Sequence, residues 1–322
     1  RTRYLKSVKK SNAKPVIKIL KIVGAALGII IFIAAIFVGV LTVTEYKPQD
    51  SEDLTVTYND QQATQDDSFP TDTNKLSQQK ELSIGDNISV VTWNIGYGSL
   101  GANADFFMDG GDSVYTSTKE QVLTNMSAIT EELNSLSPDI ILLQEVDEKS
   151  SRSHKINEAS IIKDELPSYN SSYAYNYKTL MVPYPIPPIG QVASGIMTLS
   201  TYPVSTACRI KLPCPFSYPI RLCNLKRCLI VSKVPIDGTD KELVIVNLHL
   251  EAYDSGEGKA AQTKMLADIL QAETDKGNYV IAGATSTRHF QAPTYQPIPS
   301  NPMNCGLLVS SIFQNLEMIL HV

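Results

Sequence analysis

The feature that most constrains this chain is an apolar run from Ile22 to Val43 that contains no charged residue. The run, about 22 residues long, is sufficient to cross the roughly 30 Å hydrocarbon core of a bilayer as a helix. A secretory signal peptide is the alternative, but its apolar region spans about 7–15 residues and ends in a small-x-small cleavage site. Thr42 to Tyr46 is a poor cleavage site, and a buried soluble helix would not be apolar on every face. We therefore predict a transmembrane helix over residues 22–44.

Basic residues precede this run and predict its orientation. Residues 1–21 contain eight lysines and arginines and no acidic residue, so the positive-inside rule places them in the cytoplasm and the rest of the chain outside it. We expect a single-pass protein of the cell membrane, whose partner through residues 22–44 is the lipid bilayer. Without those eight charges the formal net charge of −5 becomes −13. Such an acidic domain lacks the positive field on which non-specific nucleic-acid binding depends.

The chain after the apolar run divides into a linker and a domain. Residues 45–86 are polar and rich in Gln, Asp, Ser and Thr, which predicts a flexible linker. From residue 87 onward, short apolar runs have the texture of strands. These runs cover residues 88–93, 139–144, 227–234, 242–250 and 278–283.

Two amphipathic helices are expected to cover these strands. Ser117 and Glu120 form a capping box for the first helix, which ends at Ser137 before a proline. Its apolar residues recur at spacings of three and four, which predicts one buried stripe made of Val122, Met126, Ile129, Leu133 and Leu136. A second helix near residues 258–272 is expected to turn inward Ala261, Met265, Ile269 and Leu270. This order of elements indicates packed sheets beneath outer helices.

Two local segments leave alternatives open. Four of the five cysteines, Cys208, Cys214, Cys223 and Cys228, lie close together without zinc-site spacing. They either pair as disulfides outside the cell or remain small buried thiols. The proline-rich segment 182–190 is either a rigid loop near the mouth of a site or a plain connector.

Polar residues occur at strand ends, where a strand does not require them. Asn94 follows the first strand, Glu145 lies near the end of the second, and Asn247 and His249 interrupt an apolar strand. Carboxylate and amide oxygens suit a hard cation such as Mg²⁺, and a histidine can contact a phosphate or transfer a proton. Taken singly, each is better explained by a structural role, as a turn residue, a solvated strand end or a core histidine.

Together and in this order, these motifs resemble those of the endonuclease/exonuclease/phosphatase (DNase-I-like) superfamily, in the form of a bacterial, membrane-anchored member. The resemblance runs from residue 88 to residue 283. It rests on Trp93-Asn94-Ile95-Gly96, Gln144-Glu145-Val146-Asp147, Ser194-Gly195 and Asn247-Leu248-His249. The resemblance implies an α+β fold over residues 87–283, namely a four-layer α/β/β/α sandwich of two mixed sheets flanked by helices.

The resemblance also implies a metal site and a reaction. Asn94 and Glu145 would hold one Mg²⁺ or Mn²⁺ ion, with Glu145 as the principal ligand. His249 would bind the scissile phosphate, supported by Asn247, while water attacks the phosphoester in line. The acidic, anchored domain favours a lipid headgroup or a small phosphate ester over nucleic acid as substrate, and no protein partner is inferred.

Further residues are implied around the substrate. Ser194 and Gly195 would form a wall of the site. Asp147, Arg152 and His154 would line its mouth, although His154 is equally consistent with a surface residue.

The family pattern breaks after Gly283. The family has Gly-Asp-Phe-Asn here, whose Asp orients the attacking water and whose Asn contacts the phosphate, whereas this chain continues with Ala284 and Thr285. The final Ser-Asp-His motif of the family is also absent from the sequence. Loss of one nucleotide near the codons of Gly283 and Ala284 accounts for this, because reading across the codon boundaries permits Gly-Asp-Phe-Asn in register. We therefore expect an out-of-frame tail over residues 284–322.

An out-of-frame tail has consequences for fold and activity. The C-terminal part of the domain would be missing, which exposes sheet edges and apolar surface, and the phosphoesterase would be inactive. The alternatives are a pseudoenzyme that diverged in frame and a membrane-tethered binding module.

Overall fold

The computed structural model describes residues 13–58, 80–101, 104–251, 256–284, 307–310 and 318–321. The chain separates into two compact units, residues 1–45 and 46–322. The first unit contains the helix α1 (Ala13–Val43). Its stretch Ile17–Val43 is long and apolar enough to cross a membrane, a property that it shares with signal sequences.

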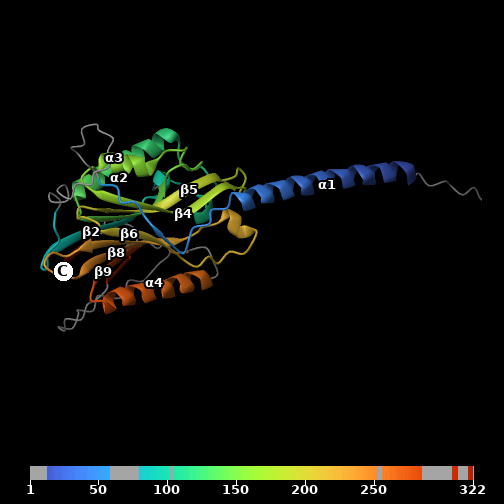
Figure 1. Ribbon diagram of the computed structural model, residues 1–322. Helices are drawn as coiled ribbons and strands as arrows, with labels where there is room; N and C mark the ends of the chain where they lie inside the picture. Colours follow the sequence, from blue (N-terminus) through green and yellow to red (C-terminus); the bar gives the residue numbers. More distant parts are fainter. Residues whose placement is uncertain are drawn as a thin grey trace, which may run out of the picture. The chain divides into compact units, whose positions relative to one another are not determined.

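Two mixed β-sheets form the centre of the second unit (Figure 1). The first sheet consists of β1 (Ser51–Asp53), β6 (Thr206–Lys211), β7 (Cys228–Pro235), β8 (Glu242–Leu248), β9 (Tyr279–Ala284) and β10 (Leu307–Ser310), in that spatial order. The second consists of β11 (Met318–His321), β2 (Asn87–Asn94), β3 (Ile140–Asp147), β5 (Gly190–Ser200) and β4 (Asn170–Val182), again in spatial order. Parallel pairing joins β8 to β9, β9 to β10 and β2 to β3, and the other neighbours are antiparallel.

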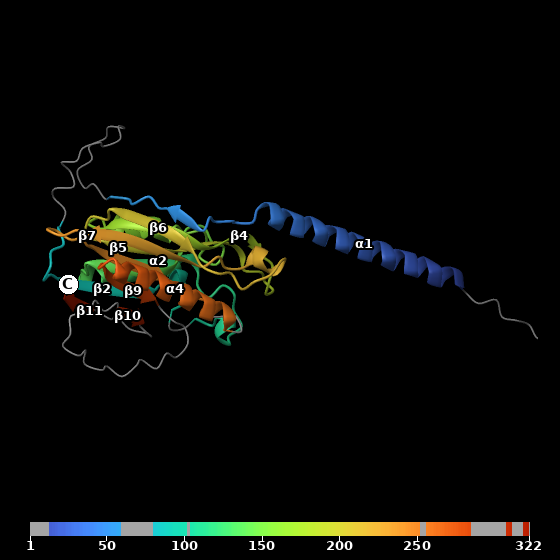
Figure 2. The same cartoon turned by 60° about the horizontal axis from the view of Figure 1, so that its bottom comes forward.

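Helices cover the outer faces of both sheets (Figures 1 and 2). On the second sheet lie α2 (Lys119–Leu136) and α3 (Glu158–Glu165), and on the first lies α4 (Glu257–Asp275). Short 3-10 helices are η2 (Gly96–Gly98), η3 (Phe107–Asp109) and η4 (Ile220–Cys223). The expected α+β fold with two mixed sheets and flanking helices is thus confirmed.

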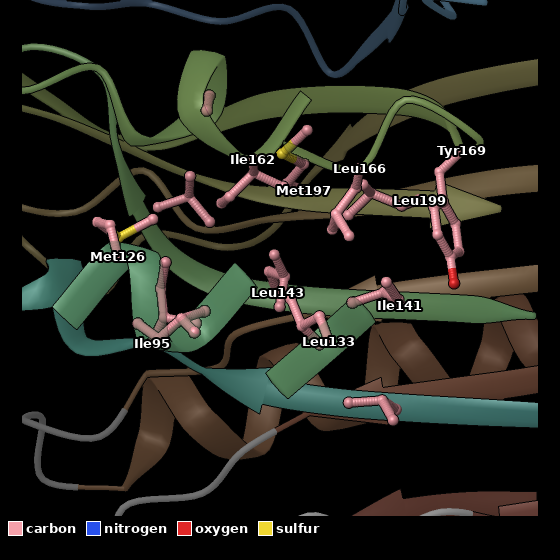
Figure 3. Packing of buried hydrophobic residues seen from close by; sticks show 14 of the residues in the cluster. Ile95, Met126, Leu133, Ile141, Leu143, Ile162, Leu166, Tyr169, Met197 and Leu199 are labelled. Atoms are coloured by element: carbon pink, nitrogen blue, oxygen red, sulfur yellow. The ribbon is translucent and has the colours of Figure 1, made fainter. Parts of the chain in front are cut away.

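Four buried apolar clusters hold together the layers of the described part of the chain, and the fourth is a small one made of Ala174, Ile196, Cys228 and Ile230. The first, between α2, α3 and the second sheet, includes Met126, Leu133, Ile141, Leu143, Ile162 and Met197 (Figure 3). The second lies between the sheets, and the third lies under α4. Strand β8 contributes Leu243 and Ile245 to the second cluster and Val244 and Val246 to the third. An apolar strand buried on both faces is what a central layer requires.

The first predicted helix is confirmed with a corrected start. Val122, Met126 and Leu133 are fully buried, and Leu136 is partly buried. The N-cap is Thr118, whose hydroxyl accepts a hydrogen bond from the amide of Gln121 at 3.2 Å. Ser117 was expected in this role, but its hydroxyl instead donates to the carbonyl of Ser99 at 3.0 Å. Either hydroxyl suits an N-cap, so the bond to the preceding loop decides between them.

The second predicted helix exists, and Met265, Ile269 and Leu270 pack against the third cluster as expected, whereas Ala261 does not. Leu266 and Gln262 are fully buried, Met265 is partly buried, and Ala261 is exposed. Gln262 is buried because its side chain bridges two backbone groups, accepting from Glu251 N at 2.8 Å and donating to Pro213 O at 2.8 Å. A polar residue with both partners satisfied can occupy a buried position that an apolar stripe does not reveal.

Part of the segment expected as a linker packs on the domain. β1 pairs with β6, Leu54 and Val56 pack against the cluster between the sheets, and Leu82 is fully buried there. Residues 59–79 of the expected linker lie outside the described residues. Both ends of the segment expected as a linker are therefore packed on the domain.

The expected tail after residue 283 is described only in two strands. The backbone of β10 pairs with β9, and that of β11 pairs with β2. Residues 285–306 and 311–317 lie outside the described residues. The out-of-frame tail and the missing C-terminal part remain predictions.

Candidate functional site

Glu145 occupies a β-bulge near the end of β3. The ladder between β3 and β5 pairs Gln144 with Ile196 and Val146 with Gly195, which leaves Glu145 as the extra residue. Its φ of 56° lies in the left-handed region, which a non-glycine residue seldom adopts. A bulge re-aims a side chain out of the regular alternation of a strand. The backbone of Glu145 is therefore left out of the ladder, and its side chain leaves the regular alternation of β3.

Two predicted site residues contact the Glu145 carboxylate. Asn94, the last residue of β2, donates from Nδ2 to Glu145 Oε1 at 3.0 Å. His249, directly after β8, places Nε2 at 3.3 Å from the same oxygen. Strands β2 and β3 belong to one sheet and β8 to the other, so the carboxylate joins the ends of both sheets.

The charge states of this pair follow from their surroundings. Burial raises the pKa of Glu145, but the hydrogen bond and charge of His249, the charge of Arg152 and the Asn94 amide outweigh it and lower that pKa to about 2. Burial and the nearby Arg227 charge lower the pKa of His249, against the opposing effect of Glu145 and Glu251. Because the pKa of His249 lies below its ordinary value, the neutral ring with its proton on Nε2 is favoured near neutral pH, where Glu145 is ionised. The charge of His249 acts on Glu145 only when that ring is protonated.

The second ring nitrogen of His249 is buried and has no hydrogen-bond partner within the described part of the chain. With its proton on Nε2, the ring presents Nδ1 as an acceptor. Buried polar atoms are normally satisfied, and an exception is expected at a functional site or beside an unseen ligand.

Asn247 and Gln144 join the two sheets beneath the site. Gln144 donates from Nε2 to Asn247 Oδ1 at 2.9 Å, and Asn247 donates from Nδ2 to the carbonyls of Met197 and Leu143 at 2.8 and 3.2 Å. Asn247 is 0% exposed. It therefore positions the end of β8, and with it His249, rather than reaching a substrate itself.

Arg152 anchors a second group of predicted residues. It binds Asp147 in a bidentate manner, with Nε to Oδ2 at 3.1 Å and Nη2 to Oδ1 at 3.0 Å, and Nη2 also donates to Ser194 Oγ at 3.1 Å. The guanidinium lies 3.6 Å from the ring centre of Tyr97. Fork geometry and stacking together fix an arginine in one orientation. Ser194, Arg152 and Asp147 are therefore brought together as the motifs suggested.

The structure gives His154 and Gly195 local structural contacts. The Nε2 atom of His154 lies 2.7 Å from the carbonyl oxygen of Ser117, which ties the loop after β3 to the start of α2. A Cβ on Gly195 would lie 2.4 Å from the carbonyl oxygen of Ala174 and 2.5 Å from Tyr173 Cζ. Glycine at this position permits the close approach of β4 and β5.

One pair of residues near His249 escaped the sequence reasoning. Arg227 Nε lies 3.7 Å from Glu251 Oε2, and both side chains are buried. Glu251 falls within the motif that follows Asn247, which was a usable signal. Arg227 had none, because it stands in a run with Lys226 next to Cys228 that reads as an ordinary strand start.

The donors present fit a hard cation in part. Glu145 offers the carboxylate, and Mg²⁺ typically takes one or two carboxylates while keeping several waters. Asn94 Oδ1 accepts from the Gly96 amide at 3.0 Å and retains a second lone pair. No cluster of three His, Cys, Asp or Glu side chains suited to a metal occurs among the described residues. The set matches a largely hydrated ion held mainly by Glu145.

One family model matches more than half of the chain. Residues 91–283 match the model of the Endonuclease/Exonuclease/phosphatase family. No curated protein matches the chain.

Similar solved structures include an endonuclease/exonuclease/phosphatase from Beutenbergia cavernae (19% identity, 56% of this chain and 44% of that chain, TM-score 0.40). Truncated TDP2 from Caenorhabditis elegans shares 20% identity over 60% of each chain, with a TM-score of 0.38. The human Nocturnin catalytic domain with bound sulfate shares 18% identity over 64% of this chain and 67% of that chain, with a TM-score of 0.39. The chain thus spans less than two thirds of the length of the first two structures.

Proposed function

The chain belongs to the endonuclease/exonuclease/phosphatase family, and from that premise we propose that it carries the metal- and phosphate-binding side of a phosphoesterase site. The observation that carries this proposal is the Glu145 carboxylate, held between Asn94 and His249 at the ends of two sheets. When bound, Mg²⁺ or Mn²⁺ would supply charge neutralisation at a phosphoryl oxygen. Glu145 would hold that ion with help from Asn94.

The remaining groups have roles toward the phosphoester. His249 Nδ1, the buried atom without a described partner, would accept a proton from the phosphoester or its attacking water, and would donate to a phosphate oxygen once the ring is protonated. Arg152, fixed by Asp147, keeps a positive charge that acts on Glu145. Ser194 lies beside it. These groups bind and orient a phosphoester, and positioning of this kind supplies much of phosphoryl-transfer catalysis.

We further propose that this chain lacks hydrolytic activity. A phosphoesterase needs a group that orients the attacking water and a partner for proton transfer. The family supplies them after the strand that ends here at Ala284, where this sequence has no matching Asp, Asn or His. The out-of-frame tail over residues 284–322 accounts for that loss. A non-catalytic, membrane-tethered phosphate-binding module is the second candidate, favoured by the retained Glu145 and His249.

The substrate and location are part of the proposal. The apolar stretch Ile17–Val43 and the basic residues before it favour a single-pass anchor with a cytoplasmic N-terminus and an extracytoplasmic domain. A domain with a formal charge of −13 after residue 21 favours a lipid headgroup or small phosphate ester over nucleic acid.

The test compares two full-length proteins. One is this chain, and the other is encoded by the same gene with a single base restored near the codon of Ala284. Both are assayed for Mg²⁺-dependent release of phosphate or alcohol from a chromogenic phosphodiester, a phosphomonoester and a phospholipid. Hydrolysis by the restored protein alone supports the family site and the frameshift. Hydrolysis by this chain refutes the proposed loss of activity, and activity in neither protein, despite Mn²⁺ binding, favours the binding module.

A further inference from the structure

Two loops of the domain expose large apolar side chains. The tip between β4 and β5 carries Tyr184 and Ile186, which are 72% and 93% exposed. The loop that leads into η4 carries Tyr218 and Ile220, which are 53% and 60% exposed. Single exposed apolar residues are common, but grouped ones mark a surface for a partner or a membrane.

These two loops are joined at the end of β4. Tyr177 donates from its hydroxyl to the Cys223 carbonyl at 2.9 Å, and Thr179 donates to the Leu222 carbonyl at 3.1 Å. Both residues precede the tip of the hairpin, and both acceptors belong to η4. Figures 1 and 2 show the yellow-orange turn of this loop at the same end of the domain as the tip of β4 and β5. The two loops therefore lie at the same end of the domain, and we call them together the loop surface (residues 176–190 and 211–228).

The charge of the loop surface is opposite to that of the domain. Residues 176–190 and 211–228 contain no acidic residue but five basic ones, Lys178, Lys211, Arg221, Lys226 and Arg227. Of these, Lys178 and Arg221 are exposed, whereas Lys211 pairs with Asp50 and the buried Arg227 pairs with Glu251. The Arg221 guanidinium lies 5.9 Å from the ring centre of Tyr218. The chain after residue 21 has a formal charge of −13, so two exposed cations with no acidic residue in either range have the opposite sign to the net charge of the domain.

Prolines hold these apolar residues in place. The segment from Pro183 to Ile189 reads PYPIPPI, and the segment from Pro213 to Ile220 contains three prolines. Because proline fixes its own φ angle, the backbone of these loops loses little further freedom on docking. The loop surface is thus preorganised for binding.

We propose that the loop surface docks on the headgroup region of a lipid bilayer. Tyrosines beside isoleucines suit the boundary between water and hydrocarbon, and exposed Lys and Arg suit anionic headgroups. The proposed anchor would keep the domain close to a membrane. The stretch Ile17–Val43 is apolar enough to cross a bilayer, and Tyr46, the first residue of the domain unit, follows Val43 by only three positions in the sequence. This inference rests on the proposed anchor and is independent of the phosphoester chemistry.

The position of the loop surface bears on the candidate site. Strand β5 runs from Gly190, next to the exposed tip, to Ser194, which accepts a hydrogen bond from Arg152. The carbonyls of Pro188 and Ile189 accept from the Tyr115 hydroxyl at 3.0 and 3.3 Å, which ties the base of the hairpin to the loop before α2. If this hairpin docks, the strands that carry part of the site would face the bilayer.

The experiment uses the full chain in phosphatidylcholine vesicles with a fraction of phosphatidylglycerol, with and without brominated phospholipid. The chain has one tryptophan, Trp93, so the native protein supplies a constant background of emission. Three single variants are compared: Ile186→Trp at the tip, Leu123→Trp on exposed α2 as the matched control, and Ile31→Trp in α1 as a report on the anchor. All three positions are exposed, so the domain fold tolerates the change.

Bromolipid is expected to quench the added emission of Ile186→Trp and Ile31→Trp and to leave that of Leu123→Trp unchanged. Quenching of Ile31→Trp alone would overturn docking while retaining the anchor. Equal quenching of Ile186→Trp and Leu123→Trp would refute a specific face. Absence of quenching in Ile31→Trp would remove the anchor and the docking together. No hydrolysis enters the measurement, so a failed phosphoesterase assay leaves its outcome unaffected.

Discussion

The imidazole Nε2 of His249 lies 3.3 Å from Oε1 of Glu145, although the two residues come from different sheets. This contact joins the ends of β3 and β8 at one point. The polar pair Gln144 and Asn247 lies in the same two strands and holds them together below it. The geometry of the site therefore depends on how the sheets face each other, and each prediction below tests one part of that dependence.

Replacing Glu145 by Gln should weaken Mn²⁺ binding by about tenfold or more, because the single carboxylate of the site loses its charge while keeping its shape. Calorimetric or spin-resonance titration of the purified chain measures this change. Glu165→Gln, at an exposed position at the end of α3, is the matched control and should bind as the native chain does. Equal affinity in both variants would show that the ion is held elsewhere.

Asn247→Ala should lower the free energy of unfolding by about 1–3 kcal/mol, because it removes buried hydrogen bonds between the two sheets. The Met197 carbonyl loses its 2.8 Å donor, and Gln144 Nε2 loses one acceptor while keeping the Leu142 carbonyl and the Thr92 hydroxyl. Urea unfolding monitored by circular dichroism gives the value. Asn134→Ala removes an exposed bond to the Glu165 carbonyl and should change stability by about 0.5 kcal/mol or less. A comparable loss in the two variants would contradict the role of Asn247 between the sheets.

Asp139 should make stability fall as the pH is lowered. Burial raises its pKa, but hydrogen bonds from Lys80 and Ser89 outweigh burial and lower it. A depressed carboxyl pKa adds stability above the unfolded-state pKa of about 3.9, and that contribution disappears as the pH falls through the folded-state pKa.

The Asp139→Asn variant should therefore be less stable than the native chain at pH 6, and the difference should shrink toward pH 3. Thermal unfolding across this range measures it. Asp268→Asn, which removes an exposed pair with Lys264, should follow the native profile. A pH-independent difference for Asp139→Asn would exclude the charge as its cause.

Gly195→Ala should be strongly destabilising, because the new methyl would lie 2.4 Å from a backbone oxygen of β4 that cannot move without disturbing the ladder. Gly101→Ala, which has no atom within 4 Å of the added carbon, should be tolerated. The melting temperatures of both variants decide the matter. If Gly195→Ala melts at the native temperature, then β4 and β5 do not approach as closely as described.

Much of the fold could be predicted because its strands are short apolar runs and its first helix has a regular stripe. The strands β1, β4, β5 and β6 were missed. The residues of β4 from Asn170 and of β6 from Thr206 alternate weakly and carry polar groups on their faces, β5 contains two glycines, and β1 has only three residues. The face of α4 was misjudged at Ala261 because Gln262 is buried through bonds to chain segments that are distant in the sequence. Hydrogen bonds to distant segments of the chain leave no pattern in the local sequence.

The candidate site divides in the same way. The motifs identified Asn94, Glu145 and His249, and the structure brings these three together. It also joins Arg152 to Ser194. The motifs could not reveal that Asn247 faces the interior or that His154 binds the start of α2, because both depend on packing rather than on residue type. Arg227 becomes relevant only once β7 is seen beside β8.

The bulge at Glu145 has a consequence for substitutions at this position. Gln144, Val146 and Asp147 pair with three consecutive residues of β5, so the ladder would close without Glu145. The pairing of β3 with β5 is therefore separate from the contacts that hold the Glu145 carboxylate, which come from Asn94 and His249. A change of this side chain would alter the contact between the ends of the two sheets and leave the ladder between β3 and β5 in place.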